Sequence, residues 1–244
     1  MKTNKMIEIE NVKRANSALN SLLCREKTES VGIGLIYGMP GLGKTRWAKQ
    51  TAIKHGYYYL QITKNHTTKT FLKDLLIALR YTYARPDDIY GTTKGLYDQI
   101  LEILQDTQDI VIFVDEIDYA FDHKQMIATI RDFADQSFAT FVLIGMHNAR
   151  NLLLKLNAHY FDRCNAFCEF KAISPEDVAM ILKGVCDVSC DKEIIDFIHK
   201  ACKGTIRLII KYVGLIELIA KEAGKDELLF KDIKGLLKNM AVES

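Results

Sequence analysis

Several features that would place a chain in a special class are missing from these 244 residues. No apolar run reaches the roughly 18 residues that a membrane span needs. The formal net charge is only +2, which argues against a chain-wide polyelectrolyte but leaves a local basic patch open. With 48% apolar residues and only three prolines, the composition is neither collagen-like nor of low complexity. We therefore expect a folded protein with one core, or one core and a small second domain.

The six cysteines lack the spacing of a metal site. Three residues separate Cys164 from Cys168, and three separate Cys186 from Cys190, whereas zinc knuckles use two. No matching histidine pair accompanies them, so buried free thiols are favoured over a zinc site. The polar start of the chain has no secretory signal pattern. We therefore expect a reducing, cytoplasmic location and no membrane contact.

Strand-like and helix-like patterns alternate along the first two thirds of the chain. Helices are predicted over 11–24, 45–56, 69–79, 93–105, 124–136 and 148–160, and strands over 31–37, 57–62, 109–116, 140–145 and 166–170. Strands that are apolar almost throughout and are separated by helices predict a parallel sheet covered on both faces.

After residue 172 the pattern becomes purely helical. In SPED, Ser174 is predicted to cap a helix that has Pro175 in its first turn, and helices are predicted near 175–186, 191–202, 205–223 and 229–239. We therefore predict an α/β domain with an N-terminal helix over 1–172 and a small all-helical domain over 173–244.

A glycine-rich loop, GMPGLGKT at 38–45, follows the first predicted strand and satisfies the pattern G-x-x-x-x-G-K-[ST]. Its glycines allow backbone N–H groups to converge on phosphate oxygens, and the next helix adds its positive dipole end. Lys44 is expected between the β- and γ-phosphates, and Thr45 at Mg²⁺. A chance match is the alternative, which the position between a strand and a helix disfavours. The predicted nucleotide-binding residues are Gly38, Met39, Pro40, Gly41, Leu42, Gly43, Lys44, Thr45 and Arg46.

Two adjacent carboxylates end the apolar run IVIFVDE at 110–116. Asp115 is predicted to hold the Mg²⁺ shell, and Glu116 to polarise a water for in-line attack on the γ-phosphate. A solvent-facing acidic turn is the alternative. Asp118 is ambiguous, with capping of the next helix as one role.

The stretch Gly204-Thr-Ile-Arg207 places an arginine at the start of a predicted helix in the second domain. A guanidinium forks onto phosphate oxygens, so Arg207 is a candidate for binding the γ-phosphate and drawing a lid closed. A local surface ion pair is the alternative.

With these motifs, the chain resembles the AAA+ ATPases over most of its length. The resemblance implies a P-loop NTPase fold with a helical lid, ATP and Mg²⁺ as cofactors, Glu116 as the water-activating residue and Arg207 as a second sensor. It also implies a homo-oligomeric ring or helical filament, in which an arginine reaches into the neighbouring subunit's site. Arg163, in YFDRCN, occupies that position, with a structural salt bridge as the alternative.

The run ATIRDFADQSFATFVLIGMHNARNLL is similar to the ATPases of DNA transposition, the bacteriophage Mu B protein and its TnsC and TniB relatives. This implies ATP-dependent assembly on target DNA and regulation of a transposase. Two departures stand out. Met146 follows Gly145 where those relatives usually have a small polar residue, which leaves His147 or Asn148 as the γ-phosphate sensor and the hydrolysis rate open. The helix-turn-helix domain of the Mu B protein also has no counterpart before the core.

DNA contacts are expected between the second and third strands, as the resemblance implies. Cations in that interval predict sequence-tolerant, salt-sensitive binding of duplex DNA, although aspartates in the same interval leave a solvated face of mixed charge as the alternative. The candidate DNA residues are Lys64, Lys69, Arg80, Arg85 and Lys94. Two other functions stay open: a replication initiator or helicase loader, and a nucleotide-gated switch that binds only protein.

Overall fold

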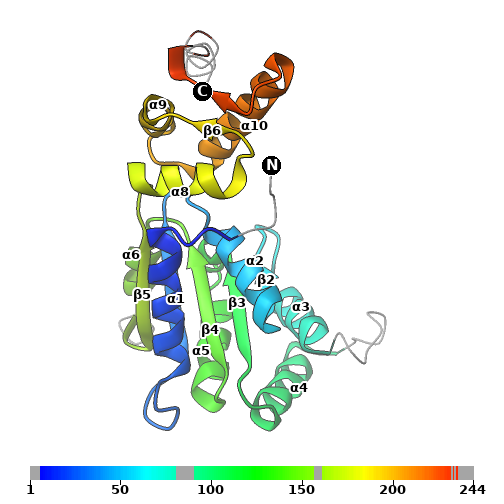
Figure 1. Ribbon diagram of the computed structural model, residues 1–244. Coiled ribbons are helices and arrows are strands. Elements are labelled where there is room, and N and C mark those ends of the chain that lie inside the picture. Colours follow the sequence, from blue (N-terminus) through cyan, green and yellow to red (C-terminus); the bar gives the residue numbers. More distant parts are fainter. Residues whose placement is uncertain (1–5, 81–90, 157–160, 232, 234, 236–244) are drawn as a thin grey trace. The chain divides into compact units, whose positions relative to one another are not determined.

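The computed structural model describes residues 6–80, 91–156, 161–231, 233 and 235 (Figure 1). The chain forms two compact units, which are described separately. The sheet unit comprises Arg14–Gly38 and Lys44–Glu169, and the C-terminal unit comprises Met1–Lys13, Met39–Gly43 and Phe170–Ser244. The middle of the glycine-rich loop therefore groups with the C-terminal unit. The domain boundary at residue 172 stays a prediction.

The sheet unit contains a five-stranded sheet with the order β2-β3-β4-β1-β5. The strands are β1 (Ile33–Gly38), β2 (Tyr58–Gln61), β3 (Val111–Asp115), β4 (Thr140–Gly145) and β5 (Cys164–Phe170). The pairs β1–β4, β3–β4 and β2–β3 are parallel, as predicted, with Gln61 opposite Asp115. Parallel pairing brings the carboxyl ends of β1, β3 and β4 to one edge, which is where open α/β sheets bind their ligands.

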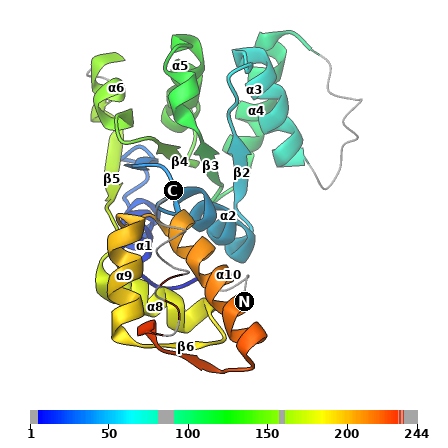
Figure 2. The same cartoon turned by 90° about the horizontal axis from the view of Figure 1, so that it is seen from above.

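Helices cover both faces of this sheet, which confirms the predicted layering (Figure 2). One face carries α1 (Glu10–Leu23) and α2 (Lys44–His55). The other carries α3 (Thr68–Arg80), α4 (Thr93–Asp106), α5 (Lys124–Gln136) and α6 (Ala149–Leu156). A short 3₁₀ helix, η2 (Ile117–Ala120), follows β3. The predicted helix over 148–160 extends past α6 into residues 157–160, which lie outside the described part.

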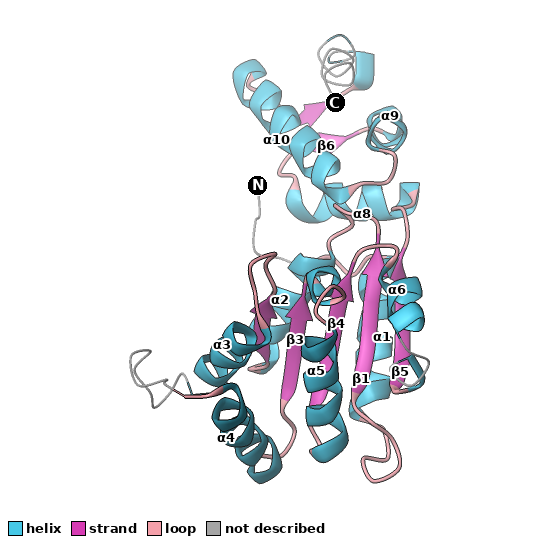
Figure 3. Cartoon of the chain, turned by 180° about the vertical axis from the view of Figure 1, so that it is seen from behind, coloured by secondary structure: helices cyan, strands magenta, loops and turns pink. Residues whose placement is uncertain are grey.

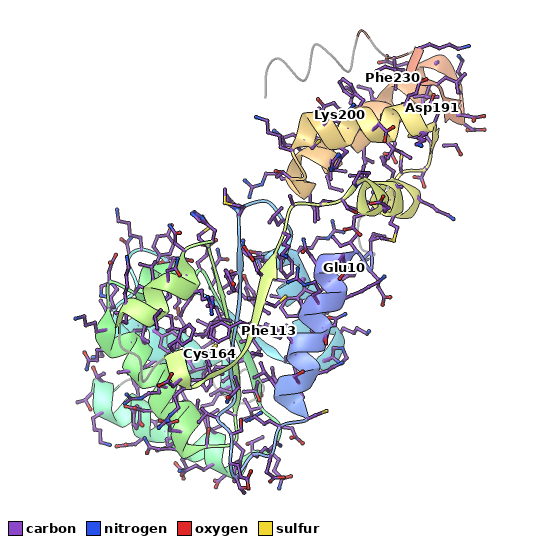
Figure 4. The ribbon with its side chains drawn as sticks, turned by 90° about the vertical axis from the view of Figure 1, so that its left-hand side faces the viewer. Glu10, Phe113, Cys164, Asp191, Lys200 and Phe230 are labelled. Carbon is purple, nitrogen blue, oxygen red and sulfur yellow. The ribbon has the colours of Figure 1, made fainter. Side chains whose placement is uncertain are left out.

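The two central strands are buried along their whole length. Every residue of β3 and of β4 is buried, because both faces of these strands are covered by helices. Phe113 of β3 lies within the sheet unit (Figure 4) and meets the ring of Trp47 from α2, with the ring centroids 5.5 Å apart in a T-shaped arrangement. Gly34 of β1 has no room for a side chain, because Leu22 of α1 packs against it. Helix and sheet are thus held together by close packing.

The C-terminal unit contains α8 (Pro175–Val185), α9 (Lys192–Cys202) and α10 (Ile206–Ala223). The predicted cap is present, since Ser174 Oγ accepts a hydrogen bond from the Asp177 amide at 3.1 Å. Of the predicted helix 229–239, residues 229–231, 233 and 235 are described. Leu229 is not helical, and the other four are. No helix in the described ranges is long and apolar enough to cross a membrane.

The prediction of an all-helical second domain is wrong in one respect, because the C-terminal unit also contains a small parallel strand pair (Figure 3). It joins β6 (Ser189–Cys190) to β7 (Glu227–Leu228). Asp191, which follows β6, links the segments next to the two strands (Figure 4). One of its carboxylate oxygens accepts a hydrogen bond from the Ile194 amide and caps α9, and the other accepts one from the Phe230 amide, both at 2.9 Å. Strands of two residues are too short to show an alternating pattern.

Candidate functional site

Lys44 opens α2 directly after the glycine-rich loop, and its side chain is buried at 8% exposure. The ammonium Nζ donates a hydrogen bond to the Gly38 carbonyl oxygen at 2.7 Å. Burial lowers the pKa of Lys44. The nearby carboxylates of Asp115, Asp118 and Glu116 act to raise it, but burial is the larger effect. A buried ammonium at a helix N-terminus is well placed to bind an anion.

The backbone of the loop uses conformations that favour glycine, with φ of 81° at Gly41 and 93° at Gly43. Within the C-terminal unit, the Arg207 amide donates to the Gly41 carbonyl at 3.2 Å. A Cβ added at Gly41 would lie 2.6 Å from Thr205 Cγ2. The predicted G-x-x-R motif therefore contacts the loop through its backbone, while the Arg207 side chain is exposed.

Asp115 ends β3 with its carboxylate buried and both oxygens hydrogen-bonded. The residue is 2% exposed. Its Oδ2 accepts from the Tyr59 hydroxyl at 2.7 Å, and its Oδ1 accepts from the Glu116 amide at 2.8 Å. Tyr59 was not identified from the sequence. Its only signal was a tyrosine in the second predicted strand, and the contact with Asp115 depends on β2 lying beside β3.

Glu116 has a left-handed backbone, with φ 57° and ψ 40°. This conformation is energetically unfavourable for residues other than glycine, and such backbone strain is concentrated at functional sites. Burial raises the pKa of Glu116, and the neighbouring carboxylates of Asp115 and Asp118 raise it further. A carboxyl group whose pKa is raised is suited to accepting a proton.

Asp118 does not cap the next helix, so that interpretation is wrong. The N-caps of η2 and α5 are Glu116 and His123. Asp118 Oδ2 instead accepts a hydrogen bond from the Met146 amide at 2.7 Å, which joins the residues that follow β3 to those that follow β4. Burial raises the pKa of Asp118. The observed partner, the Met146 amide, follows a strand that is distant in sequence, and local capping rules do not consider such partners.

The candidate sensors His147 and Asn148 are exposed directly after β4, next to Met146. Burial is the main cause that raises the pKa of Asp118, and the electrostatic interaction with His147 opposes that shift. Thr45 and Arg46 follow Lys44 in the first turn of α2, with Thr45 partly buried and Arg46 exposed. The choice between His147 and Asn148 as sensor stays a prediction.

Arg163 forms the structural salt bridge that was the alternative to a role at a neighbouring site. Its Nε lies 3.0 Å from Asp135 Oδ1. Asp135 also lies 3.9 Å from Arg131, which in turn contacts Asp132. The Arg163 side chain is 47% exposed. Its role toward a neighbouring subunit stays a prediction.

The candidate DNA residues lie in surroundings of mixed charge. Lys64 and Lys69 are exposed, and Arg80 is partly buried at the end of α3. Lys94 forms an ion pair with Asp98 at 2.6 Å, one helical turn away. Arg85 lies outside the described residues. The DNA role of all five residues stays a prediction.

The residues present fit ATP and Mg²⁺. Lys44 and the loop amides suit phosphate oxygens. Mg²⁺ is usually bound through one or two carboxylates together with substrate phosphates, and Asp115 keeps lone pairs that its two protein donors do not use. The Thr45 hydroxyl, on the helix that Lys44 opens, would supply a further oxygen ligand.

A family model for the AAA domain (AAA_22) matches residues 27–153, just over half of the chain. The chain belongs to the AAA domain family. This AAA domain runs from the loop before β1 into α6 and includes the glycine-rich loop, Asp115 and Glu116. The family supports ATP binding. No curated protein matches the chain by sequence.

Solved structures share the fold at low identity. The Aeropyrum pernix ORC2 protein in ADPNP and ADP complexes has a TM-score of 0.71 at 16% identity, covering 100% of this chain and 70% of that one. The Aeropyrum pernix ORC1 protein in complex with DNA has 0.63 at 16%, covering 92% and 63%. A Thermotoga maritima RuvB variant has 0.61 at 19%, covering 95% and 69%. The chain thus spans about two thirds of the length of these proteins, and the likeness shows the AAA+ fold alone.

Proposed function

We propose that this AAA domain protein hydrolyses ATP to ADP and phosphate with Mg²⁺. The observation that carries the proposal is geometric: the buried ammonium of Lys44, hydrogen-bonded to the Gly38 carbonyl, lies near Asp115, Glu116 and Asp118 at the carboxyl end of the parallel strands. There, burial disfavours the charged form of Lys44 and also the charged forms of Glu116 and Asp118. A Mg²⁺-bound triphosphate brings negative charge to the ammonium and positive charge to the carboxylates. The site is therefore complementary to that ligand in both signs.

Each residue has a distinct task in this mechanism. Lys44 would bind the β- and γ-phosphates, and Asp115 would hold Mg²⁺ through lone pairs that Tyr59 and the Glu116 amide do not use. When bound, the ion would neutralise charge on the phosphate oxygens. Glu116 takes the proton of the attacking water. The hydrogen bond from Met146 to Asp118 holds the segment that carries His147 and Asn148, and Arg207 senses the γ-phosphate.

The substitution Glu116→Gln tests the chemical step. ATP binding, measured by calorimetry, is expected to persist, because the amide keeps the shape of the side chain. Phosphate release is expected to fall by about 10²- to 10⁴-fold, the usual contribution of a general base. Glu102→Gln removes an exposed carboxylate of α4 and serves as the matched control. Unchanged turnover in Glu116→Gln would show that another group activates the water, and no heat on mixing with ATP would remove the proposal.

We further propose duplex DNA as a partner, with ATP-dependent assembly of copies in the cytoplasm. The favoured task is target selection and transposase regulation in DNA transposition, which rests on the sequence resemblance of residues 128–153. A replication initiator is the second candidate, because the folds of the Aeropyrum pernix ORC proteins are similar. A switch that binds only protein is the third.

Filter binding with duplex DNA separates these candidates. Transposition predicts binding that requires ATP, tolerates different sequences and weakens with salt. An initiator predicts strong preference for one sequence. Absence of binding at low salt, or binding that ignores nucleotide, would contradict the transposition role.

A further inference from the structure

We propose that Tyr59 is a positioning residue for Asp115 and sets the affinity of the site for its divalent cation. The inference rests on the proposed function and adds a residue outside the sequence motifs. The observation behind it is the 2.7 Å hydrogen bond from the Tyr59 hydroxyl to Asp115 Oδ2.

Two contacts other than the hydrogen bond to Asp115 restrict the position of Tyr59. The Tyr59 backbone lies in β2, where it is paired with Phe113 of β3. The ring lies under the ammonium of Lys49, with Nζ 5.1 Å from the ring centroid, a favourable cation–π arrangement. Strand pairing and this contact from α2 therefore hold the ring, and the hydroxyl follows from the ring.

The hydrogen bond restricts how Asp115 can present its oxygens. An ionised carboxylate offers about four lone-pair positions on two oxygens. Tyr59 occupies one on Oδ2, and the Glu116 amide occupies one on Oδ1. Rotation of the carboxylate would break both bonds in a buried setting, where an unpaired charged group is costly. The remaining lone pairs therefore keep a defined direction.

Tyr59 also links the two elements that carry the candidate metal ligands. Thr45 and Lys49 lie four residues apart on α2, hence on the same side of that helix. Lys49 contacts the Tyr59 ring, and Tyr59 contacts Asp115 at the end of β3. Hydrogen-bonding partners of this kind orient metal ligands, and their loss typically costs about 10- to 100-fold in metal affinity.

The substitution Tyr59→Phe removes the hydroxyl and keeps the ring under Lys49. Affinity for ATP is measured by calorimetry without divalent metal and across a Mg²⁺ titration, so the readout does not depend on turnover. We expect the metal-free affinity to stay within about twofold of the wild type, and the Mg²⁺ concentration for half-maximal enhancement to rise about 10- to 100-fold.

Tyr57→Phe is the matched control, because Tyr57 lies two residues earlier and its ring stacks on His55 at 5.3 Å. It is expected to leave the Mg²⁺ midpoint unchanged. The double variant Tyr59→Phe with Asp115→Asn should show no further loss beyond Asp115→Asn, because the two groups act as one unit.

The possible results separate this inference from the proposed function. A wild-type protein that binds no ATP contradicts the proposed function itself. Wild-type binding that responds to Mg²⁺, with an unchanged midpoint in Tyr59→Phe, overturns the positioning role alone. An equal loss of metal-free and metal-dependent affinity in Tyr59→Phe shows a general structural defect and also overturns it.

Discussion

The charges at the carboxyl edge of the sheet and those around the end of α5 are organised in opposite ways. At the sheet edge, burial lowers the pKa of Lys44 and raises the pKa values of Glu116 and Asp118, so it favours the neutral form of each group. Around α5, Arg163 and Asp135 are partly exposed and paired at 3.0 Å. The surface charges are paired with one another, whereas at the sheet edge burial disfavours the charged forms, an effect that the charges of a Mg²⁺-bound triphosphate would offset. This contrast distinguishes a binding site from a solvated ion pair.

The largest expected effect comes from removing the buried ammonium. Lys44→Met should weaken ATP binding by about 10- to 100-fold, because the hydrogen bonds from the ammonium to the charged phosphate oxygens are lost. The nucleotide-free protein should keep or raise its Tm, because a desolvated charge is replaced by an apolar chain of similar length.

Calorimetry and thermal unfolding of the same sample check this pair of outcomes. Lys54→Met, at an exposed position of α2, is the control for loss of a positive charge. A variant that binds ATP normally, or that loses binding only because it unfolds, would contradict the role of the buried Lys44 ammonium in phosphate binding.

An intermediate effect is expected from pH in the nucleotide-free protein. The raised pKa values of Glu116 and Asp118 mean that their stabilising contribution is full below the unfolded pKa values of about 4 and is lost as pH rises through the folded pKa values. The double variant Glu116→Gln with Asp118→Asn lacks these ionisations. Its Tm should equal the wild-type Tm near pH 4 and exceed it increasingly toward pH 7. A Tm difference that is constant with pH would contradict burial as the cause.

The smallest effect is expected at the surface network. Arg163→Ala should cost no more than about 1 kcal/mol of unfolding free energy, as exposed ion pairs do, measured by denaturant titration. Arg131→Ala disturbs the same network and is the matched control. If Arg163 also reaches a neighbouring site, its variant alone should lose ATP turnover in the assembled protein while keeping ATP affinity. Equal turnover in both variants would leave Arg163 with the salt bridge only.

The parts of the site that were predictable come from patterns local in sequence. The apolar runs of β1 and β3 end at the glycine-rich loop and at Asp115, and parallel pairing brings such ends together. The Ser174 cap is likewise a local hydrogen bond. The partners of Asp118 and Arg163 could not be predicted in this way, because each partner is a residue that only folding brings close. The strand pair β6–β7 was not predicted, because a strand of two residues is too short to show an alternating pattern of apolar and polar residues.

The sequence alone predicted a parallel α/β sheet, the loop that opens α2 and the two carboxylates after β3, because each follows from backbone chemistry and apolar periodicity within a short segment. The AAA+ assignment came from the resemblance of these motifs to a known family. Tertiary structure decided which groups share the site. Tyr59 meets Asp115, and Asp118 meets the Met146 amide, only because β2, β3 and β4 lie side by side in a particular register. Burial then shifts the pKa values, since desolvation depends on all the atoms packed around a group rather than on its neighbours in sequence.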